Sequence, residues 1–129
     1  MATTMAMSLT ITVEHLEPAN AHVLVCLVCA GEISLQTLAT VRQSVNSLIK
    51  SDNFVKGDQL ILDLSDVNFI DTSGLGALLG IKDIWSDERG RLALVINPIV
   101  KQRFEITGLD RWFEIYPNRD EALKQLAHR

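Results

Sequence analysis

The hydrophobic pattern changes its period along the first part of the chain. Leu9-Thr10-Ile11-Thr12-Val13 alternates apolar and polar residues, which is typical of a half-exposed strand. After a break at Pro18-Ala19-Asn20, the apolar run from His22 to Ala30 predicts a buried second strand that forms a hairpin with the first. An amphipathic helix follows, with Ser34 as its candidate N-cap. Its apolar stripe consists of Leu38, Val41, Val45, Leu48 and Ile49.

Strands and helices alternate through the rest of the chain. The expected elements are, in order, a strand at 59–64, a helix from about Ser73 to Asp87, a strand at 91–96, a short helix, a strand at 112–116 and a final helix. Asn97-Pro98 and Gly108 mark the two ends of the short helix, and Asn118–Glu121 resembles a capping box for the final one. This order predicts an α/β fold with a largely parallel or mixed sheet and crossover helices.

Composition and charge narrow the classes of partner. The 129 residues are enough for one domain. Sixteen acidic and twelve basic residues give a net charge of -4 without a basic cluster, so we expect no nucleic acid partner. The longest apolar run, Val23–Ala30, is far shorter than the about 20 residues of a membrane-spanning helix, so we expect no membrane partner. The segment Met1–Ser8 lacks the features of a signal peptide, which predicts a cytoplasmic protein with a flexible N-terminus over residues 1–8.

Cys26 and Cys29 have the CxxC spacing of metal and redox sites. They lie in a predicted strand, where residues three apart point to opposite faces, so the two sulfur atoms are not expected to meet. We therefore interpret both as small buried hydrophobic residues and expect no metal. The three histidines, His15, His22 and His128, lie far in sequence from the candidate site described next and are expected to be surface or packing residues.

The segment from Asp71 to Gly76 is the candidate functional centre. Val67–Ile70 ends a predicted strand, so the segment forms a strand-to-helix turn, where functional groups collect in parallel sheets. Thr72 and Ser73 place two hydroxyls at a helix N-terminus, and Gly74 and Gly76 are expected to let the backbone turn tightly and approach its neighbours. Helix capping alone is the simpler interpretation, because Asp, Thr and Ser are all good N-caps.

Three catalytic or cofactor interpretations of this turn are weak. Gly74, Gly76 and Gly80 have a spacing similar to a dinucleotide-binding turn, but the next strand ends at Ile96-Asn97 without an acidic residue for the ribose. A Walker turn needs Gly-Lys-Ser or Gly-Lys-Thr, which the chain lacks. A nucleophile elbow needs glycine where Asp71 stands. We therefore expect no catalytic residue, no cofactor and no enzymatic activity.

The motifs together resemble the STAS domain of anti-sigma factor antagonists. The resemblance extends from about Ser8 to Ala127 and implies a single STAS-like domain over residues 9–127. In this family the fold is α/β, which implies a mixed sheet of about five strands with about four helices packed mainly on one face. The motifs that carry the resemblance are Gly31-Glu32-Ile33, Leu62–Val67, Phe69–Gly76, Asn97–Val100, Gly108-Leu109, Phe113 and Glu121–Leu123.

The resemblance implies a function in bacterial sigma-factor control by partner switching. In this family the unphosphorylated antagonist binds an anti-sigma factor, which is also an ATP-binding serine kinase of the GHKL type, and thereby releases a sigma factor. Phosphorylation of the antagonist ends this binding, and a PP2C-type phosphatase restores it. The phosphorylated hydroxyl directly follows the Asp of the motif, which corresponds to Thr72 here, with Ser73 as the second candidate.

The same resemblance implies a partner-binding surface around the turn. Two positions depart from the family pattern, since Ser34 stands where Asp is common and Thr72 replaces the commoner Ser. The alternative function is a STAS scaffold or accessory subunit of a signalling or transport complex, in which Thr72 serves only as a cap. The expected partner-binding residues are Gly31, Glu32, Ser34, Asp71, Thr72, Ser73, Gly74, Leu75 and Gly76.

Overall fold

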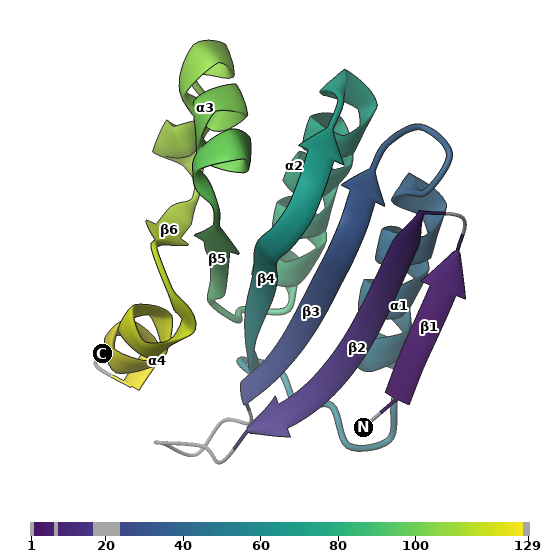
Figure 1. Ribbon diagram of the computed structural model, residues 1–129. Coiled ribbons are helices and arrows are strands. Elements are labelled where there is room, and N and C mark those ends of the chain that lie inside the picture. Colours follow the sequence, from purple (N-terminus) through teal and green to yellow (C-terminus); the bar gives the residue numbers. More distant parts are fainter. Residues whose placement is uncertain (1, 7, 17–23, 128–129) are drawn as a thin grey trace.

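A mixed sheet of six strands forms the centre of the molecule (Figure 1). The computed structural model describes residues 2–6, 8–16 and 24–127. The strands, in spatial as well as sequence order, are β1 (Ala2–Ala6), β2 (Leu9–Leu16), β3 (Leu24–Ile33), β4 (Gln59–Ile70), β5 (Leu92–Ile96) and β6 (Glu114–Tyr116). The helices are α1 (Leu38–Lys50), α2 (Thr72–Asp87), α3 (Pro98–Thr107), the short 3-10 helix η1 (Leu109–Trp112) and α4 (Arg119–Ala127). The first three strands pair antiparallel and β3 to β6 pair parallel, which confirms the predicted mixed α/β sheet.

The strand β1 was not predicted. Ala2–Ala6 pairs antiparallel with β2, from Ala2 opposite Val13 to Ala6 opposite Leu9, where a flexible segment was expected. Without this pairing the outer edge of β2 would expose unpaired backbone groups. Ser8, with a φ of 63°, turns the chain back onto that edge. The sheet therefore has one strand more than the expected five. The predicted turn at Pro18-Ala19-Asn20 lies outside the described residues, as do His22 and His128.

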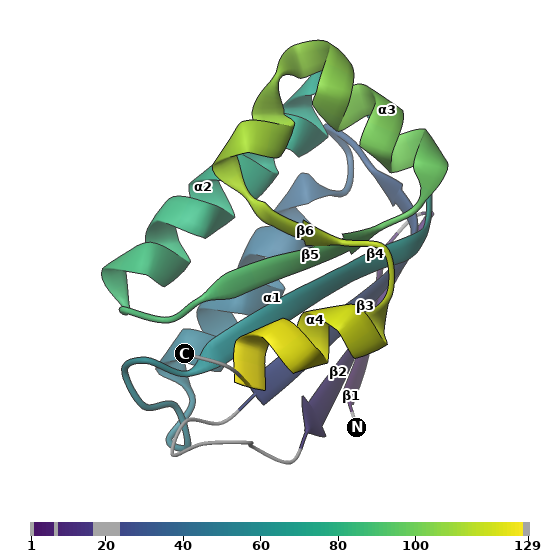
Figure 2. The same ribbon diagram turned by 90° about the vertical axis from the view of Figure 1, so that its left-hand side faces the viewer.

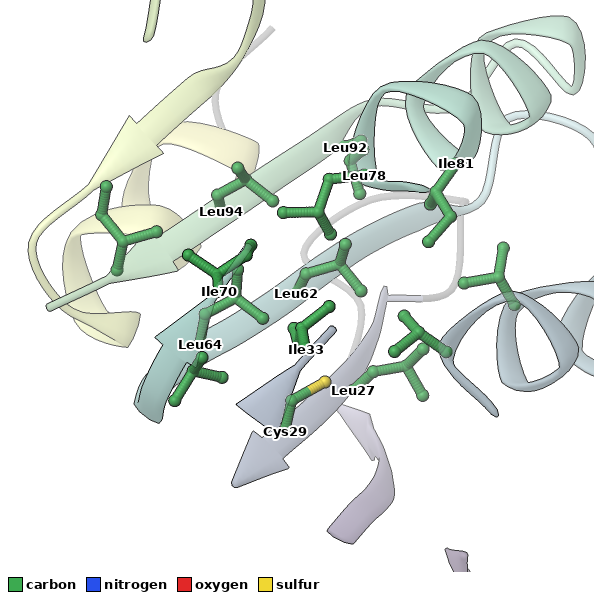
Figure 3. Close-up of a cluster of buried hydrophobic side chains, with 14 of the residues drawn as sticks. Leu27, Cys29, Ile33, Leu62, Leu64, Ile70, Leu78, Ile81, Leu92 and Leu94 are labelled. Atoms are coloured by element: carbon green, nitrogen blue, oxygen red, sulfur yellow. The ribbon is translucent and has the colours of Figure 1, made fainter. Parts of the chain in front are cut away.

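The main hydrophobic core lies on the face of the sheet that α1 and α2 cover (Figures 1 and 2). Side chains from α1, α2 and α3 all belong to this core, which agrees with the prediction that the helices pack mainly on one face. Trp85 of α2 is fully buried, and its indole N–H donates to the carbonyl oxygen of Asp58 at 2.9 Å. Figure 3 shows part of the core, including Leu27, Cys29, Ile33, Leu62, Leu64, Ile70, Leu78, Ile81, Leu92 and Leu94.

The helix α4 covers the opposite face of the sheet (Figure 2). Ala122 and Leu126 are fully buried there in a second, smaller core cluster. At the start of α4 the guanidinium of Arg119 lies 2.6 Å from a carboxylate oxygen of Glu14, and at its end the Leu126 carbonyl accepts from Gln59 at 2.9 Å. None of the described helices combines the length and apolar character needed to cross a bilayer.

The predicted helix ends are confirmed at three places, while the start of one helix and the start of one strand are corrected. Asn97 and Asn118 each cap a helix by accepting a backbone N–H at 2.9 Å, and Gly108 adopts the left-handed conformation at the end of α3. Ser34 is not the N-cap of α1, because its carbonyl closes a turn and the helix begins only at Leu38, after Thr37. The last strand begins at Glu114 rather than at residue 112, since η1 takes up residues 109–112.

The two cysteines lie on opposite faces of the sheet, as predicted. Cys29 belongs to the main core and Cys26 to the cluster under α4, and both are free and fully buried. Burial raises the pKa of each thiol from its ordinary value of 9.0 to about 12. Within the described ranges no three His, Cys, Asp or Glu side chains form a group that could hold a metal ion.

This burial predicts that the native thiols resist alkylation. At pH 8 the folded protein should react with iodoacetamide far more slowly than the protein in 6 M guanidinium, because the reactive thiolate is almost absent from the fold. Mass spectrometry over time measures the labelling. The linkage has a defined sign: the neutral buried thiols favour the fold below pH 9, and this contribution is lost as the pH rises from about 9 towards 12. Rapid labelling of both native cysteines would contradict their burial.

Candidate functional site at the Asp71 turn

The site forms where β3 and β4 end side by side. The two strands are parallel, and their last paired residues are Ile33 and Ile70. The loop that leads from β3 into α1, residues 34–37, therefore lies beside the turn that leads from β4 into α2 (Figure 1). The carboxyl ends of neighbouring parallel strands are the usual place for functional groups in such sheets.

Asp71 joins these two segments through its backbone and both carboxylate oxygens. One carboxylate oxygen accepts the Gly74 N–H at 2.8 Å, and the carbonyl accepts the Leu75 N–H at 3.0 Å, so Asp71 is the N-cap of α2. The other carboxylate oxygen accepts the Leu35 N–H at 3.2 Å. The backbone N–H of Asp71 donates to the Ile33 carbonyl at 3.3 Å. A single residue thus fixes the start of α2 against the β3–α1 loop.

The two hydroxyls of the turn differ in exposure. Thr72, the first residue of α2, is exposed, and Ser73 is half-buried. Within the described part of the chain the Thr72 hydroxyl has no hydrogen-bond partner. The side-chain cap of α2 comes from Asp71, so the helix does not need the Thr72 hydroxyl as a cap. Thr72 is thus an exposed residue that does not take part in the side-chain cap of α2.

The glycines of the turn have different environments. A Cβ on Gly74 would lie 2.3 Å from the Ile33 carbonyl oxygen and 2.9 Å from Ile70 Cγ1, so the close approach expected here is confirmed. Gly76 is exposed, and a Cβ there would meet nothing within 4 Å, so the same expectation is wrong for Gly76. Leu75 is only 4% exposed and packs into the main core, which leaves its side chain little surface to offer a partner.

The residues at the end of β3 have mainly structural contacts. Gly31 has a φ of +118°, and a Cβ there would lie 2.1 Å from the Ser8 carbonyl oxygen, which also accepts the Glu32 N–H at 2.7 Å. Ser34 is only 3% exposed, and its hydroxyl donates to the Gln36 side-chain oxygen at 3.0 Å. Of these three predicted partner-binding residues, Ser34 is buried, while Gly31 and Glu32 are partly exposed.

Sequence reasoning missed two residues of the β3–α1 loop. The Thr37 hydroxyl accepts the Ser34 N–H at 2.9 Å and donates to the Glu32 carbonyl at 2.8 Å, which closes the loop. The position of Thr37, directly before the first apolar residue of the helical stripe, is a signal that could have found it. Leu35, the second residue of this loop, is 66% exposed. No periodic pattern marks Leu35, because it lies between the strand and the helix.

Comparisons with known proteins agree with this architecture. The family model of the STAS domain matches residues 11–122. The chain is 30% identical over 98 residues to the anti-sigma F factor antagonist of Paenibacillus polymyxa, which covers 75% of this chain and 81% of that protein. Among solved structures, an anti-sigma factor antagonist from Mycobacterium paratuberculosis superimposes with a TM-score of 0.77 at 27% identity, covering 92% of this chain and 94% of that one.

A more distant structure extends the likeness of fold. The anti-sigma-factor antagonist domain protein from Planctomyces limnophilus has a TM-score of 0.63 at 19% identity and covers 91% of this chain and 97% of its own. The sheet order and the strand-to-helix turn at Asp71 agree with this fold. The STAS family model covers most of the chain, residues 11–122. The chain belongs to the STAS domain family.

Proposed function

We propose that this protein is an anti-sigma factor antagonist controlled by phosphorylation of Thr72. Its unphosphorylated form binds an anti-sigma factor, which is also an ATP-binding serine kinase of the GHKL type, and thereby releases a sigma factor. The observation that carries the proposal is the exposed Thr72 hydroxyl at the start of α2, beside a cap that Asp71 already provides. The relative from Paenibacillus polymyxa, named an anti-sigma F factor antagonist, supports the partner class.

Phosphorylation transfers the γ-phosphoryl group of ATP, bound on the kinase, to the Thr72 hydroxyl. The Thr72 oxygen attacks the γ-phosphorus of ATP on the kinase, a new O–P bond forms, and the bond to the β-phosphate oxygen breaks with its electron pair. ADP leaves, and a base on the kinase takes the hydroxyl proton. A PP2C-type phosphatase reverses the modification by hydrolysis, releasing inorganic phosphate and the free hydroxyl. All catalytic groups belong to the partners, while this protein supplies the acceptor.

The phosphate acts on binding through its charge. It adds about -1.5 to -2 charges beside the Asp71 carboxylate, on a chain whose net charge is already -4. The free N–H groups at the start of α2 can stabilise the phosphate within the antagonist itself. A partner that covers this turn has to desolvate that charge and place it against its own surface. Phosphorylation thus weakens the complex without requiring a large change of fold.

Phosphate mapping tests the proposal. The protein is incubated with ATP and the anti-sigma kinase encoded nearest to its gene, and tandem mass spectrometry locates the modification. We expect phosphate on Thr72, its loss in Thr72→Ala, and its retention in Ser73→Ala. The variant Thr72→Ser serves as a positive control for a kinase that prefers serine. Absence of phosphate from both Thr72 and Ser73, with an active kinase, would refute the switch.

A further inference from the structure

We infer that Leu35 anchors the partner-binding surface and that Asp71 is the positioning residue that holds Leu35 beside Thr72. This inference rests on the proposed function, because the occupant of the surface is the anti-sigma partner. The partner-binding surface then includes a second loop, which is remote in sequence from the Thr72 turn. Asp71 has a role beyond capping α2.

Leu35 is exposed on a loop whose backbone is held by hydrogen bonds. Its side chain is 66% exposed, although the loop that carries it is closed by buried hydrogen bonds between Ser34 and Thr37. Ser34 and Thr37, which enclose Leu35 and the exposed Gln36, are only 3% and 1% exposed, so both ends of the loop are buried. Because the backbone of this loop is already ordered, binding costs little further loop entropy, and the exposed apolar side chain of Leu35 can bury its surface at a low cost.

A hydrogen bond connects the loop that carries Leu35 to the turn that carries Thr72. The Leu35 N–H donates to one oxygen of the Asp71 carboxylate at 3.2 Å, while the other oxygen accepts from Gly74 at 2.8 Å. Leu35 and Asp71 are 36 positions apart, and Thr72 directly follows Asp71. The Asp71 carboxylate therefore couples the position of the exposed leucine to the residue that we propose is phosphorylated. A partner that covers Thr72 meets Leu35 on the adjacent loop.

The same contact makes Leu35 sensitive to the phosphate. A phosphate on Thr72 competes for the N–H groups at the start of α2, among them that of Gly74, and repels the neighbouring Asp71 carboxylate. Displacement of this carboxylate removes the acceptor that Leu35 uses. Phosphorylation therefore acts twice, by adding charge at the centre of the surface and by releasing its apolar anchor.

The variant Asp71→Asn separates the two roles of Asp71. Asparagine is an N-cap as good as aspartate, and Asn97 and Asn118 cap helices in this protein, so the amide oxygen can still accept from Gly74. The amide NH2 group would then face the Leu35 N–H, and a donor cannot accept a hydrogen bond. We expect an unchanged circular dichroism spectrum and about tenfold faster hydrogen exchange at the Leu35 amide, measured by NMR.

Partner affinity is measured on the same variants by calorimetry with the anti-sigma kinase in the absence of ATP. We expect Leu35→Ala and Asp71→Asn each to weaken binding about tenfold or more, and the double variant to bind no more weakly than the weaker single one. Val55→Ala is the matched control. Val55 is 59% exposed but lies in the loop before β4, at the opposite end of the sheet. The affinity of Val55→Ala for the anti-sigma kinase should therefore equal that of the wild type.

The outcomes distinguish this inference from the proposed function. Failure of the wild-type protein to bind any anti-sigma kinase would overturn the proposed function and the partner that the inference names. Wild-type binding that Thr72→Glu abolishes, but that Leu35→Ala and Asp71→Asn leave intact, would overturn the inference alone. Unchanged exchange at the Leu35 amide in Asp71→Asn would overturn the positioning role of Asp71, whatever the partner.

Discussion

Thr72→Glu is expected to abolish binding of the anti-sigma partner, whereas Thr72→Ala should bind within about twofold of the wild type. Glutamate places a permanent negative charge at the exposed first residue of α2, next to Asp71. A complex that buries this position pays for desolvation of the charge, and each 1.4 kcal/mol lost corresponds to about a tenfold weaker affinity. Alanine removes a hydroxyl that has no hydrogen-bond partner within the described residues, and it adds no charge at position 72. Isothermal titration calorimetry without ATP measures both affinities.

Thr72→Gln is the matched control for size. Glutamine has nearly the shape of glutamate but no charge, so a charge effect predicts that Thr72→Gln keeps most of the affinity that Thr72→Glu loses. Equal losses in the two variants would show that bulk rather than charge disturbs the interface. Equal binding by Thr72→Glu and Thr72→Ala would contradict the switch itself.

Gly74→Ala is expected to destabilise the fold by about 1–3 kcal/mol, the usual range for an overpacked site. The added Cβ would lie 2.3 Å from the Ile33 carbonyl oxygen, which is backbone and cannot rotate away as a side chain can. Relief of this clash requires α2 to move away from the end of β3, which also weakens the contacts of Asp71. Equilibrium unfolding in urea, followed by circular dichroism, measures the change in free energy.

Gly76→Ala, two residues further along the same helix, should have the opposite sign. A Cβ at Gly76 meets nothing within 4 Å, so the substitution only improves helix propensity and should stabilise the fold by about 0.5–1 kcal/mol. Equal destabilisation by both substitutions would mean that helix geometry, rather than contact with Ile33, restricts Gly74.

The elements that the sequence predicts correctly are those with local signals. The N-caps Asn97 and Asn118 and the C-cap Gly108 each act on backbone groups within a few residues of their own position. The location of the strand-to-helix turn at Asp71 could also be predicted from the sequence, because a buried strand and an apolar helix flank it. The STAS resemblance rested on these same motifs, and the match over residues 11–122 confirms it.

The features that escaped prediction depend on contacts between distant segments. Nothing near Asp71 in the sequence shows that its carboxylate also holds Leu35, 36 positions away. The pairing of Ala2–Ala6 with β2 likewise depends on an available sheet edge rather than on a local period. Gly74 and Gly76 look equivalent in the motif, and they differ only because Ile33 and Ile70 approach Gly74 closely.

Because Cys26 and Cys29 lie on opposite faces of the sheet, their two thiols report separately on the detachment of the helices that cover each face. Cys29 lies in the layer that α1 and α2 cover, and Cys26 lies beneath α4. Detachment of α4 alone uncovers only Cys26, whereas separation of the larger helical layer uncovers Cys29. The order in which the two sulfur atoms become accessible therefore distinguishes sub-global opening of one layer from cooperative unfolding of the whole domain.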